Sequence, residues 1–403
     1  FHLLLLPSMV RELKPGISIG LFIHIPWPSY EVFRLLPWRT EILEGMLGAD
    51  LLGFHTYGYV RHFLSSVRRL LGYDTIFNRV SIDERTLMVD AFPRGLHYEK
   101  FEEEVKALNE NGYSKENDIR RQIEYHLDNS DDKKLILSID PLDYTKGIPQ
   151  RVRAFELFLE EHPEYLEKVS LLLLALPSGE TGEAYYSLKR QVDELVGRIN
   201  GSFGTITWSP IIYLNQHFSI EELIGLYAYS NIALILPLRD GMNMAAKEYV
   251  ASRIDGTGVL ILSELAGAAK ELHEGILVNP NNLGEVVDAI KLALEMPEEE
   301  QKRRNKVMNE RLKRYTLERW ANEFISKLEG VKKIQESTLT RKVSENKRRE
   351  IISKYKKAGR RILFLDYDGT LSWFKKNPED AKPDEELYNI VAGLTDNKKN
   401  TVT

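Results

Sequence analysis

Two short segments place charged side chains beside glycine, each directly after an apolar run. In the first, residues 142–147, Lys146 stands next to Gly147 just beyond the apolar run 134–139. A glycine lets the backbone come close to a phosphate group, and a lysine supplies positive charge. In an open parallel sheet, ligands bind beyond the carboxyl ends of the strands. The segment indicates a phosphate-binding turn; an ordinary strand–helix turn with an exposed lysine explains the spacing equally well.

The second segment, residues 239–243, follows the apolar run 232–238 in the same way. Its backbone amides begin a predicted helix, and Asp240 stands beside them. Glu248 falls on the helix face that a bound ribose would meet, and carboxylates commonly pair with sugar hydroxyls. A capped helix start with a solvated aspartate is the competing interpretation, and spacing alone slightly favours it.

His24 ends the apolar run 17–25 and is followed by Ile25 and Pro26. A histidine at the end of a buried strand can reach a ligand beyond the strand. On an apolar strand, however, a lone histidine is more often a core residue than a catalytic one. Its spacing alone therefore does not establish a catalytic role.

Near the end of the chain, Asp366 and Asp368 follow an apolar strand and precede Gly-Thr-Leu. This pattern resembles the first motif of haloacid-dehalogenase-like phosphatases. The resemblance implies that Asp366 attacks phosphorus to form an aspartyl phosphate and that Asp368 protonates the leaving alkoxide. It also implies a Mg²⁺ ion held by both aspartates, which screens their repulsion from the phosphate. The start of a phosphatase-like domain is therefore expected here.

The elements that must position these residues alternate regularly along the chain. Short apolar runs predict strands at residues 17–25, 51–54, 87–92, 134–139, 169–176, 232–238, 259–262 and 276–278. Amphipathic stretches between them predict helices at residues 30–46, 59–71, 150–161, 184–199, 220–228, 242–251 and 283–293. Such alternation is typical of α/β proteins with doubly wound parallel sheets. All-apolar strands such as 171–174 are expected to be buried on both faces.

Changes in composition divide the chain into four predicted regions. Residues 1–132 are expected to form a first lobe and residues 133–330 a second, because the polar stretch 101–132 interrupts the alternation. Residues 331–358 are rich in charge and predict a linker or solvated helix, and residues 359–403 begin the phosphatase-like domain. The opening run 1–7 lacks the flanks of a signal peptide, so we expect a buried strand or helix within a domain. We interpret both ends as truncations.

Composition excludes several classes of protein. A net charge of −5 over 403 residues favours neither a nucleic acid nor an anionic membrane as partner. Hydrophobic residues at 43% and charged residues at 29% are typical of a globular protein with a sizeable core. The chain has no cysteine, which excludes disulfides and thiolate chemistry and is compatible with the cytoplasm.

Residues 1–330 resemble the trehalose-6-phosphate synthase family of retaining glycosyltransferases. The matching motifs are His-Leu-Leu-Leu-Leu-Pro at 2–7, His-Ile-Pro at 24–26, Phe-Arg-Leu-Leu-Pro at 33–37, Gly-Phe-His-Thr-Tyr at 53–57, the two segments 142–147 and 239–243, Gly-Arg-Ile-Asn at 197–200 and Ser-Glu at 263–264. The resemblance implies the GT-B arrangement, two Rossmann-like lobes facing across a cleft. It implies transfer of glucose from UDP-glucose to glucose 6-phosphate, giving trehalose 6-phosphate and UDP, with no metal in the transfer step.

The same resemblance implies roles for individual residues. His24 would lie at the donor sugar, Lys146 would neutralise the leaving diphosphate, and Glu248 would hold the ribose. Contacts to the glucose hydroxyls and the diphosphate would come from Asp240 and the stretch that follows it, Gly241, Met242, Asn243 and Met244. The phosphatase motif behind the synthase-like part resembles bifunctional synthase–phosphatase fusions, and a homo-oligomer is compatible with this organisation.

Four positions depart from the family pattern. Pro141 stands where the family usually has an arginine that helps to bind the donor diphosphate, and Gly179 where an arginine usually grips the acceptor phosphate. Gly58 and His97 each stand where aspartate is usual. An arginine–phosphate contact contributes roughly 1.5–3 kcal/mol. Two hypotheses therefore remain beside the synthase: a synthase-like regulatory domain attached to the phosphatase, and a transferase for another phosphorylated acceptor.

Overall fold

The structure is a computed structural model that describes residues 2–82, 85–111, 133–177, 182–339, 345–367, 371 and 382–403. The chain divides into two compact units, Phe1–Gln335 and Glu336–Thr403. The first unit contains two separate β-sheets, and the second contains a short pair of strands.

The first sheet has five strands in the order β1-β2-β5-β4-β3. They are β1 (Gly20–Ile23), β2 (Leu51–Phe54), β3 (Thr75–Ile76), β4 (Arg79–Ile82) and β5 (Arg85–Ala91). The strands β1, β2 and β5 are parallel, as predicted, and β3 and β4 add an antiparallel hairpin that the sequence analysis missed. Phe77 and Asn78 turn this hairpin with φ of 46° and 62°. Without glycine at the turn, the hairpin lacks the usual sequence signal.

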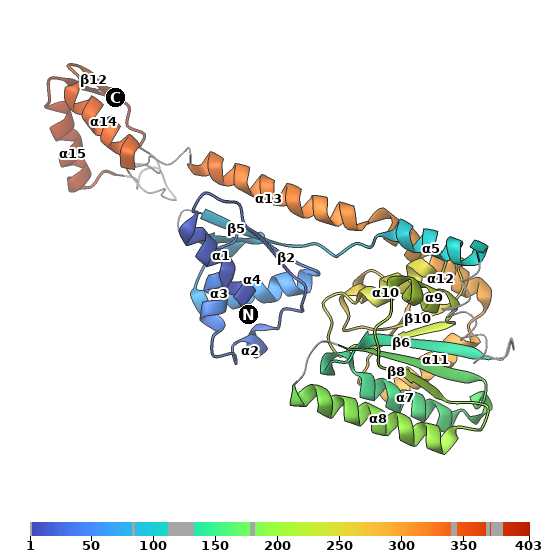
Figure 1. Cartoon of the computed structure of the whole chain (residues 1–403). Coiled ribbons are helices and arrows are strands. Elements are labelled where there is room, and N and C mark those ends of the chain that lie inside the picture. Colours follow the sequence, from blue (N-terminus) through green and yellow to red (C-terminus); the bar gives the residue numbers. More distant parts are fainter. Residues whose placement is uncertain are drawn as a thin grey trace. The chain divides into compact units, whose positions relative to one another are not determined.

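Helices cover both faces of this sheet (Figure 1). On one side lie α1 (His2–Leu13), α2 (Tyr30–Phe33), α3 (Arg39–Met46) and α4 (Tyr57–Leu71). On the other side α13 (Leu317–Leu339) packs Trp320 and Phe324 near Leu51 and Phe92. The single helix predicted at 30–46 is two helices, because Pro37 has no amide hydrogen to continue the first.

The opening run is a helix, but it is not buried throughout. Leu3 is 69% exposed and Met9 58% exposed on one face of α1. The opposite face packs tightly on α3 and on the turn that follows it, where a Cβ at Gly48 would lie 2.2 Å from the Ser8 nitrogen. The sequence analysis predicted a buried strand or helix here, whereas this helix buries only the face that meets α3.

The second sheet has six parallel strands in the order β11-β10-β9-β6-β7-β8. They are β6 (Lys134–Pro141), β7 (Val169–Leu176), β8 (Ile211–Leu214), β9 (Ile232–Ile235), β10 (Val259–Ser263) and β11 (Ile276–Val278). Residues 171–174 of β7 are at most 4% exposed, so this strand is buried on both faces, as predicted. The strand β8 was not predicted; of its four residues only Ile211 is fully buried.

Two layers of helices enclose the second sheet (Figure 1). One layer contains α7 (Ile148–Glu161), α8 (Glu183–Phe203) and α11 (Leu283–Glu295). The other contains α5 (Tyr98–Asn111), α9 (Ile220–Tyr229), α10 (Met244–Ser252) and α12 (Glu298–Arg314). Tyr98, Phe101 and Val105 of α5 belong to the core of this sheet. The predicted lobe boundary at 132 adjoins residues 112–132, which lie outside the described residues.

The second unit contains α14 (Glu345–Lys357), β12 (Arg361–Leu363), α15 (Glu385–Thr395) and β13 (Asn400–Val402). The strands β12 and β13 are parallel. Asp366 is exposed shortly after β12, whereas Asp368 lies outside the described residues. Within the described ranges, no cluster of three His, Asp or Glu side chains suits a metal ion. The Mg²⁺ site of the phosphatase motif therefore stays a prediction.

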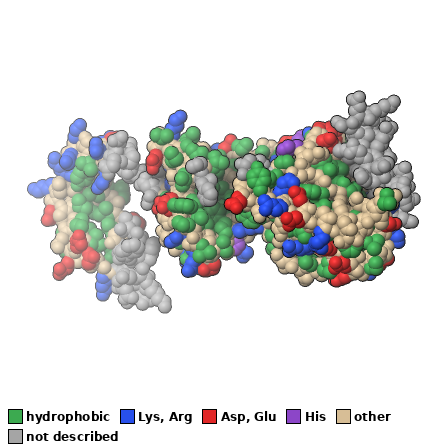
Figure 2. All heavy atoms as spheres, turned by 60° about the horizontal axis from the view of Figure 1, so that its bottom comes forward, with side chains coloured by type: hydrophobic (Ala, Val, Ile, Leu, Met, Phe, Trp, Pro, Cys, Tyr) green, Lys and Arg blue, Asp and Glu red, His purple; other side chains and the backbone are tan. Residues whose placement is uncertain are grey.

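The surface carries both signs of charge. Figure 2 shows acidic and basic side chains interspersed with hydrophobic ones over the described atoms of one face. Within the described ranges, none of the helices combines the length and the apolar character that crossing a membrane requires.

Candidate active site

A polar pocket of about 340 Å³ contains most of the residues that the sequence analysis selected. We call it the Lys146 pocket. The predicted residues that line it are His24, Pro141, Lys146, Asp240, Met242, Asn243, Met244 and Glu248. They come from both lobes and, in the second lobe, from segments that follow β6 and β9. The carboxyl ends of these neighbouring strands therefore meet where a parallel sheet is expected to bind a ligand.

Gly241 brings the two lobes into direct contact beside this pocket. A Cβ atom at this position would lie 1.9 Å from the carbonyl oxygen of His24. Gly267 packs behind it, where a Cβ would lie 2.0 Å from the Gly241 carbonyl oxygen. Only glycine fits between these backbones, so the absence of a side chain at Gly241 lets this segment contact the first lobe beside the pocket.

Lys146 lies in a short turn that holds it over the pocket. The turn is η1 (Tyr144–Lys146), capped by Asp143, whose carboxylate accepts a 2.7 Å hydrogen bond from the Thr145 amide. Gly147 then adopts φ of 64°, a conformation that favours glycine. The Thr145 carbonyl accepts hydrogen bonds from the amides of Leu238 and Arg239 at 2.8 and 3.1 Å. The turn after β6 and the segment after β9 are thus joined through their backbones.

The carboxylate of Asp240 contacts two side chains in the pocket, those of Lys146 and Asn243. The Lys146 ammonium lies 2.5 Å from its carboxylate, and the Asn243 amide donates to the same oxygen at 3.1 Å. Asn243 has φ of 69° and caps α10, accepting a hydrogen bond from the Ala246 amide at 3.2 Å. The helix start, Lys146 and Asp240 form one connected group that an anionic ligand can enter.

A buried ion pair lies beneath this group. The Arg151 guanidinium is 2.7 Å from the Asp140 carboxylate, and the two side chains are 0% and 3% exposed. Arg151 also donates to the Ser138 hydroxyl at 2.6 Å and to the Lys146 carbonyl at 2.9 Å. Burial raises the pKa of Asp140, and the Arg151 guanidinium opposes that rise. The pair ties the end of β6 to the turn that carries Lys146.

Glu248 and Lys247 follow each other on α10 but have different surroundings. The Tyr227 hydroxyl donates to the Glu248 carboxylate at 3.0 Å, and burial raises the pKa of Glu248. Lys247 is 1% exposed; its ammonium donates at 2.7 Å to both the Glu271 carboxylate and the Arg94 carbonyl. Glu248 therefore faces the pocket, whereas Lys247 fastens α10 to the segment that connects the lobes.

Two histidines of the first lobe meet at the edge of the pocket. The ring nitrogens Nδ1 of His24 and Nε2 of His55 are 3.3 Å apart. Burial, followed by the neighbouring His24, Lys247 and Arg94, lowers the pKa of His55 to about 3. Burial and Arg94 also lower the pKa of His24. Both imidazoles are therefore neutral at pH 7, and the pair can share one hydrogen bond.

Comparison with known proteins agrees with the motifs and the fold described above. The model of glycosyltransferase family 20 matches residues 1–330. The chain belongs to glycosyltransferase family 20. A bifunctional trehalose-6-phosphate synthase/phosphatase of Thermoproteus tenax is 42% identical over 398 residues, which are 98% of this chain and 53% of that protein. This family 20 chain therefore spans about half the length of that relative, and the predicted resemblance is confirmed.

Solved structures confirm the predicted GT-B fold of the family 20 chain. A trehalose-phosphate synthase of Burkholderia xenovorans in complex with glucose-6-phosphate matches with a TM-score of 0.76 and 33% identity, over 82% of this chain and 72% of that chain. An E. coli structure bound with UDP-2-fluoro glucose matches with a TM-score of 0.76 and 34% identity, over 81% and 71% of the two chains.

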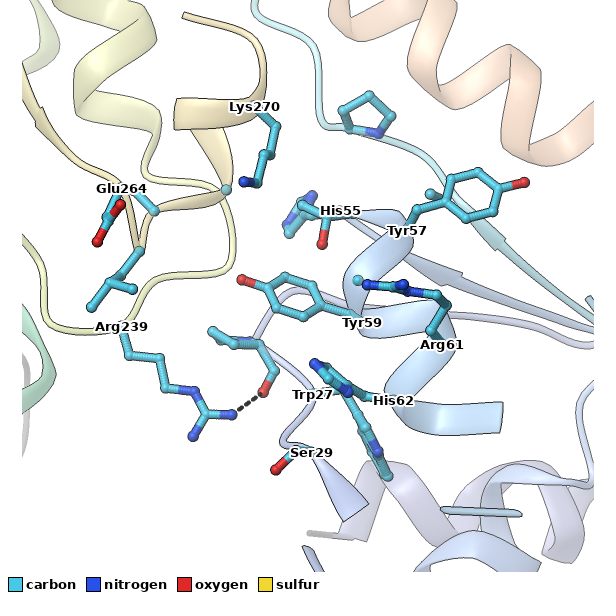
Figure 3. Close-up of a pocket in the computed structure, with 18 of the residues that line it drawn as sticks. Trp27, Ser29, His55, Tyr57, Tyr59, Arg61, His62, Arg239, Glu264 and Lys270 are labelled. Atoms are coloured by element: carbon cyan, nitrogen blue, oxygen red, sulfur yellow. Dashed lines mark hydrogen bonds between the residues drawn. The ribbon is translucent and has the colours of Figure 1, made fainter. Parts of the chain in front are cut away.

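A second, larger cavity of about 840 Å³ adjoins the Lys146 pocket of the family 20 chain and shares His55 with it. Figure 3 shows Arg61 of the first lobe and Lys270 of the second pointing into this cavity, with Glu264 turned away. Arg239 donates to the Pro26 carbonyl at 3.4 Å. This cavity contains none of the predicted donor residues, so we place the candidate active site in the smaller Lys146 pocket on chemical grounds.

Sequence reasoning missed several residues of the site in this family 20 chain. His55 belongs to the motif at 53–57 that carried the resemblance, so a signal for it existed. Tyr227 and Arg151 lie on predicted helices, and no local pattern separates them from other helical residues. Arg94 follows Pro93 between the lobes and lines the pocket without any sequence signal. Gly179 lies outside the described residues.

Proposed function

We propose that the parent protein transfers glucose from UDP-glucose to glucose 6-phosphate, giving trehalose 6-phosphate and UDP. The observation that carries this proposal is the pairing of Lys146 with Asp240 between His24 and Glu248 in one pocket. The names of the similar proteins support it, since they include a UDP-forming trehalose-phosphate synthase with glucose-6-phosphate bound. An E. coli neighbour bound with UDP-2-fluoro glucose supports a nucleotide sugar as donor.

The donor would lie along the pocket from Glu248 to His24. The Glu248 carboxylate accepts hydrogen bonds from the ribose hydroxyls, and its partner Tyr227 keeps it in place. The start of α10, with Asn243 and the adjoining Met244, presents backbone amides to the diphosphate. Asp240, Gly241 and Met242 border the glucose, and neutral His24 contributes a hydrogen bond without adding a charge.

The chemistry of transfer then depends on positioning and charge. The bond between the anomeric carbon and the diphosphate oxygen breaks, and a hydroxyl oxygen of the acceptor bonds to the same face of that carbon. A diphosphate oxygen takes the acceptor's proton, so UDP leaves and configuration is retained. Lys146 moves from Asp240 toward the departing diphosphate and stabilises its negative charge. Holding both substrates in line supplies much of the remaining acceleration.

We infer a second activity for the parent protein from Asp366 and Asp368. Phosphomonoester hydrolysis with Mg²⁺ fits the motif, and the Thermoproteus tenax relative is named as a synthase/phosphatase. The predicted regions 1–132, 133–330, 331–358 and 359–403 remain our proposal for the domains, as do a cytoplasmic location and a homo-oligomer. No nucleic acid partner is proposed.

A regulatory domain is the second candidate function. Pro141 favours it, because this residue lines the Lys146 pocket without offering a charge or a hydrogen-bond donor. The connected group of Lys146, Asp240 and Asn243 favours the enzyme, since a domain without catalysis has no physical need for it.

The deciding experiment measures UDP release from UDP-glucose by the full parent protein, with and without glucose 6-phosphate. Release that depends on the acceptor, with a non-reducing disaccharide phosphate as product, supports the synthase. Binding of UDP-glucose without any release would contradict it and favour the regulatory domain. Release with another phosphorylated acceptor alone would identify the related transferase.

A further inference from the structure

The Lys146 pocket is short of positive charge for the donor that we propose. Three carboxylates line it: Asp140 is paired with the buried Arg151 and Asp240 with Lys146, and Glu248 accepts a hydrogen bond from the Tyr227 hydroxyl. Among the described residues that line it, Lys146 and Arg94 are the cationic side chains, since both histidines are neutral at pH 7. Lys146 is already paired with Asp240 at 2.5 Å. A diphosphate therefore needs a second cation to enter this pocket favourably.

Arg94 is available for such a contact. Its side chain is half-buried at the pocket, and within the described part of the chain its guanidinium makes no hydrogen bond or ion pair. A guanidinium can offer two parallel donors to a phosphate. Position 141, which lines the same pocket, holds a proline that has no charge and no amide hydrogen to offer.

The backbone around Arg94 is held from three sides. The Lys247 ammonium donates to the Arg94 carbonyl at 2.7 Å. The Trp320 indole donates to the Phe92 carbonyl at 3.2 Å, and the Leu317 amide donates to the Leu96 carbonyl at 3.1 Å. At Gly95 a Cβ would lie 2.2 Å from the Thr316 carbonyl oxygen. The side chain of Arg94 thus starts from a fixed point at the pocket wall, which lowers the entropic cost of binding.

Arg94 lines the pocket together with His24 and Glu248, the residues proposed for the sugar end and the ribose end of the donor. Burial and then the Arg94 guanidinium lower the pKa of His24, at the proposed sugar end of the pocket. Burial raises the pKa of Glu248, at the proposed ribose end, and the Arg94 guanidinium opposes that rise. The diphosphate is the group that joins glucose to ribose in the donor, so a cation that lines the same pocket as His24 and Glu248 can contact it.

We propose that Arg94 binds the diphosphate of the nucleotide sugar and supplies, from the segment between the lobes, the guanidinium that position 141 lacks. The inference rests on the proposed function and deepens it, because it names the residue that completes the charge of the same pocket. As UDP leaves, Arg94 and Lys146 share the negative charge of the diphosphate.

The test is calorimetric titration of UDP into the full parent protein and its variants. Arg94→Gln should weaken UDP binding at least tenfold, and Arg94→Lys should weaken it less, because one ammonium keeps the charge but loses the paired donors. Adding Pro141→Arg to Arg94→Gln should restore most of the lost affinity. Arg68→Gln on α4 is the matched control, since exposed Arg68 lines neither cavity and should leave binding unchanged.

Uridine, followed by saturation-transfer NMR, separates a phosphate contact from damage to the pocket. Arg94→Gln should leave uridine binding unchanged, because uridine has no diphosphate. Equal loss of UDP and uridine, or wild-type UDP affinity in Arg94→Gln, would overturn the role of Arg94. If UDP binding depends on Arg94 but no glucose is transferred, the inference stands and the proposed transfer fails. A chain that does not bind UDP at all would contradict both.

Discussion

The guanidinium of Arg151 and the carboxylate of Asp140 form an ion pair at 2.7 Å with both side chains buried. The pair connects three parts of the site, because Arg151 also holds the Lys146 carbonyl and Asp140 faces the Asn243 amide at 3.4 Å. Burying two charges is costly unless each is fully paired. The pair therefore supports the geometry of the site more than it adds net stability.

Replacing Arg151 with methionine should destabilise the chain strongly. The change leaves the Asp140 carboxylate buried without its cation, which costs about 3–5 kcal/mol. Urea unfolding followed by circular dichroism measures the loss. The double variant Arg151→Met with Asp140→Leu should recover part of it, since no unpaired charge remains. Similar stability of Arg151→Met and the wild type would contradict the buried pair.

Removing the ammonium of Lys146 should slow transfer more than it weakens binding of the acceptor. Lys146→Gln is expected to lower kcat by about 10²–10³, the usual loss when one stabilising group at a departing charge is removed. Initial rates of UDP release at saturating substrates give kcat. Lys189→Gln, on an exposed pair with Asp193 at 2.7 Å, is the control and should match the wild type. An unchanged kcat in Lys146→Gln would refute the role of Lys146.

Glu248 should distinguish ribose from deoxyribose. The wild type is expected to bind UDP more tightly than 2′-deoxy-UDP, and Glu248→Gln should bind the two with nearly equal affinity. Its loss of UDP affinity should be about ten- to a hundredfold, because a charged hydrogen bond contributes roughly 1.5–3 kcal/mol. Titration of both nucleotides into both proteins gives the four affinities. Persistent preference for UDP in Glu248→Gln would place the ribose elsewhere.

A methyl group at Gly241 should disrupt the contact between the lobes. In Gly241→Ala the new Cβ would lie 1.9 Å from the His24 carbonyl oxygen, so the loop must shift at a cost of about 1–3 kcal/mol. We expect lower stability and lower affinity for UDP-glucose. Gly58→Ala is the matched control, because its Cβ would meet only Thr56 Oγ1 at 3.6 Å and alanine favours a helix. Normal binding and stability in Gly241→Ala would contradict the close approach.

His55 should make the folded chain sensitive to acid. The pKa of His55 is about 3 in the folded chain, against an ordinary value of 6.5. Between these values the unfolded chain binds more protons, so stability falls as pH drops below 6.5, by about 1.4 kcal/mol per pH unit from this group. His55→Asn should flatten this slope in urea titrations between pH 7 and pH 4.5. The exposed His217, changed to Asn, should leave the slope as it is.

Local patterns determined much of the fold and of the candidate site. Strands such as β7 were predictable because a strand buried on both faces needs an unbroken apolar run. Lys146 and Asp240 were singled out because each follows such a strand at its carboxyl end, where parallel sheets bind ligands. The family resemblance, and not the spacing, assigned roles to them and to Glu248 on the following helix. The hairpin β3–β4 was missed because residues other than glycine form its turn.

The tertiary structure decided which residues share the pocket. Arg94 lies 47 residues before Pro141 in the sequence and yet lines the same pocket, because the segment between the lobes returns to the end of β6. Arg151 has the sequence context of any helical arginine, and only the packing of α7 under β6 shows that it is buried against Asp140. Local patterns reflect the preferences of neighbouring residues. Charge balance inside a pocket depends on residues distant in sequence, which only folding brings together.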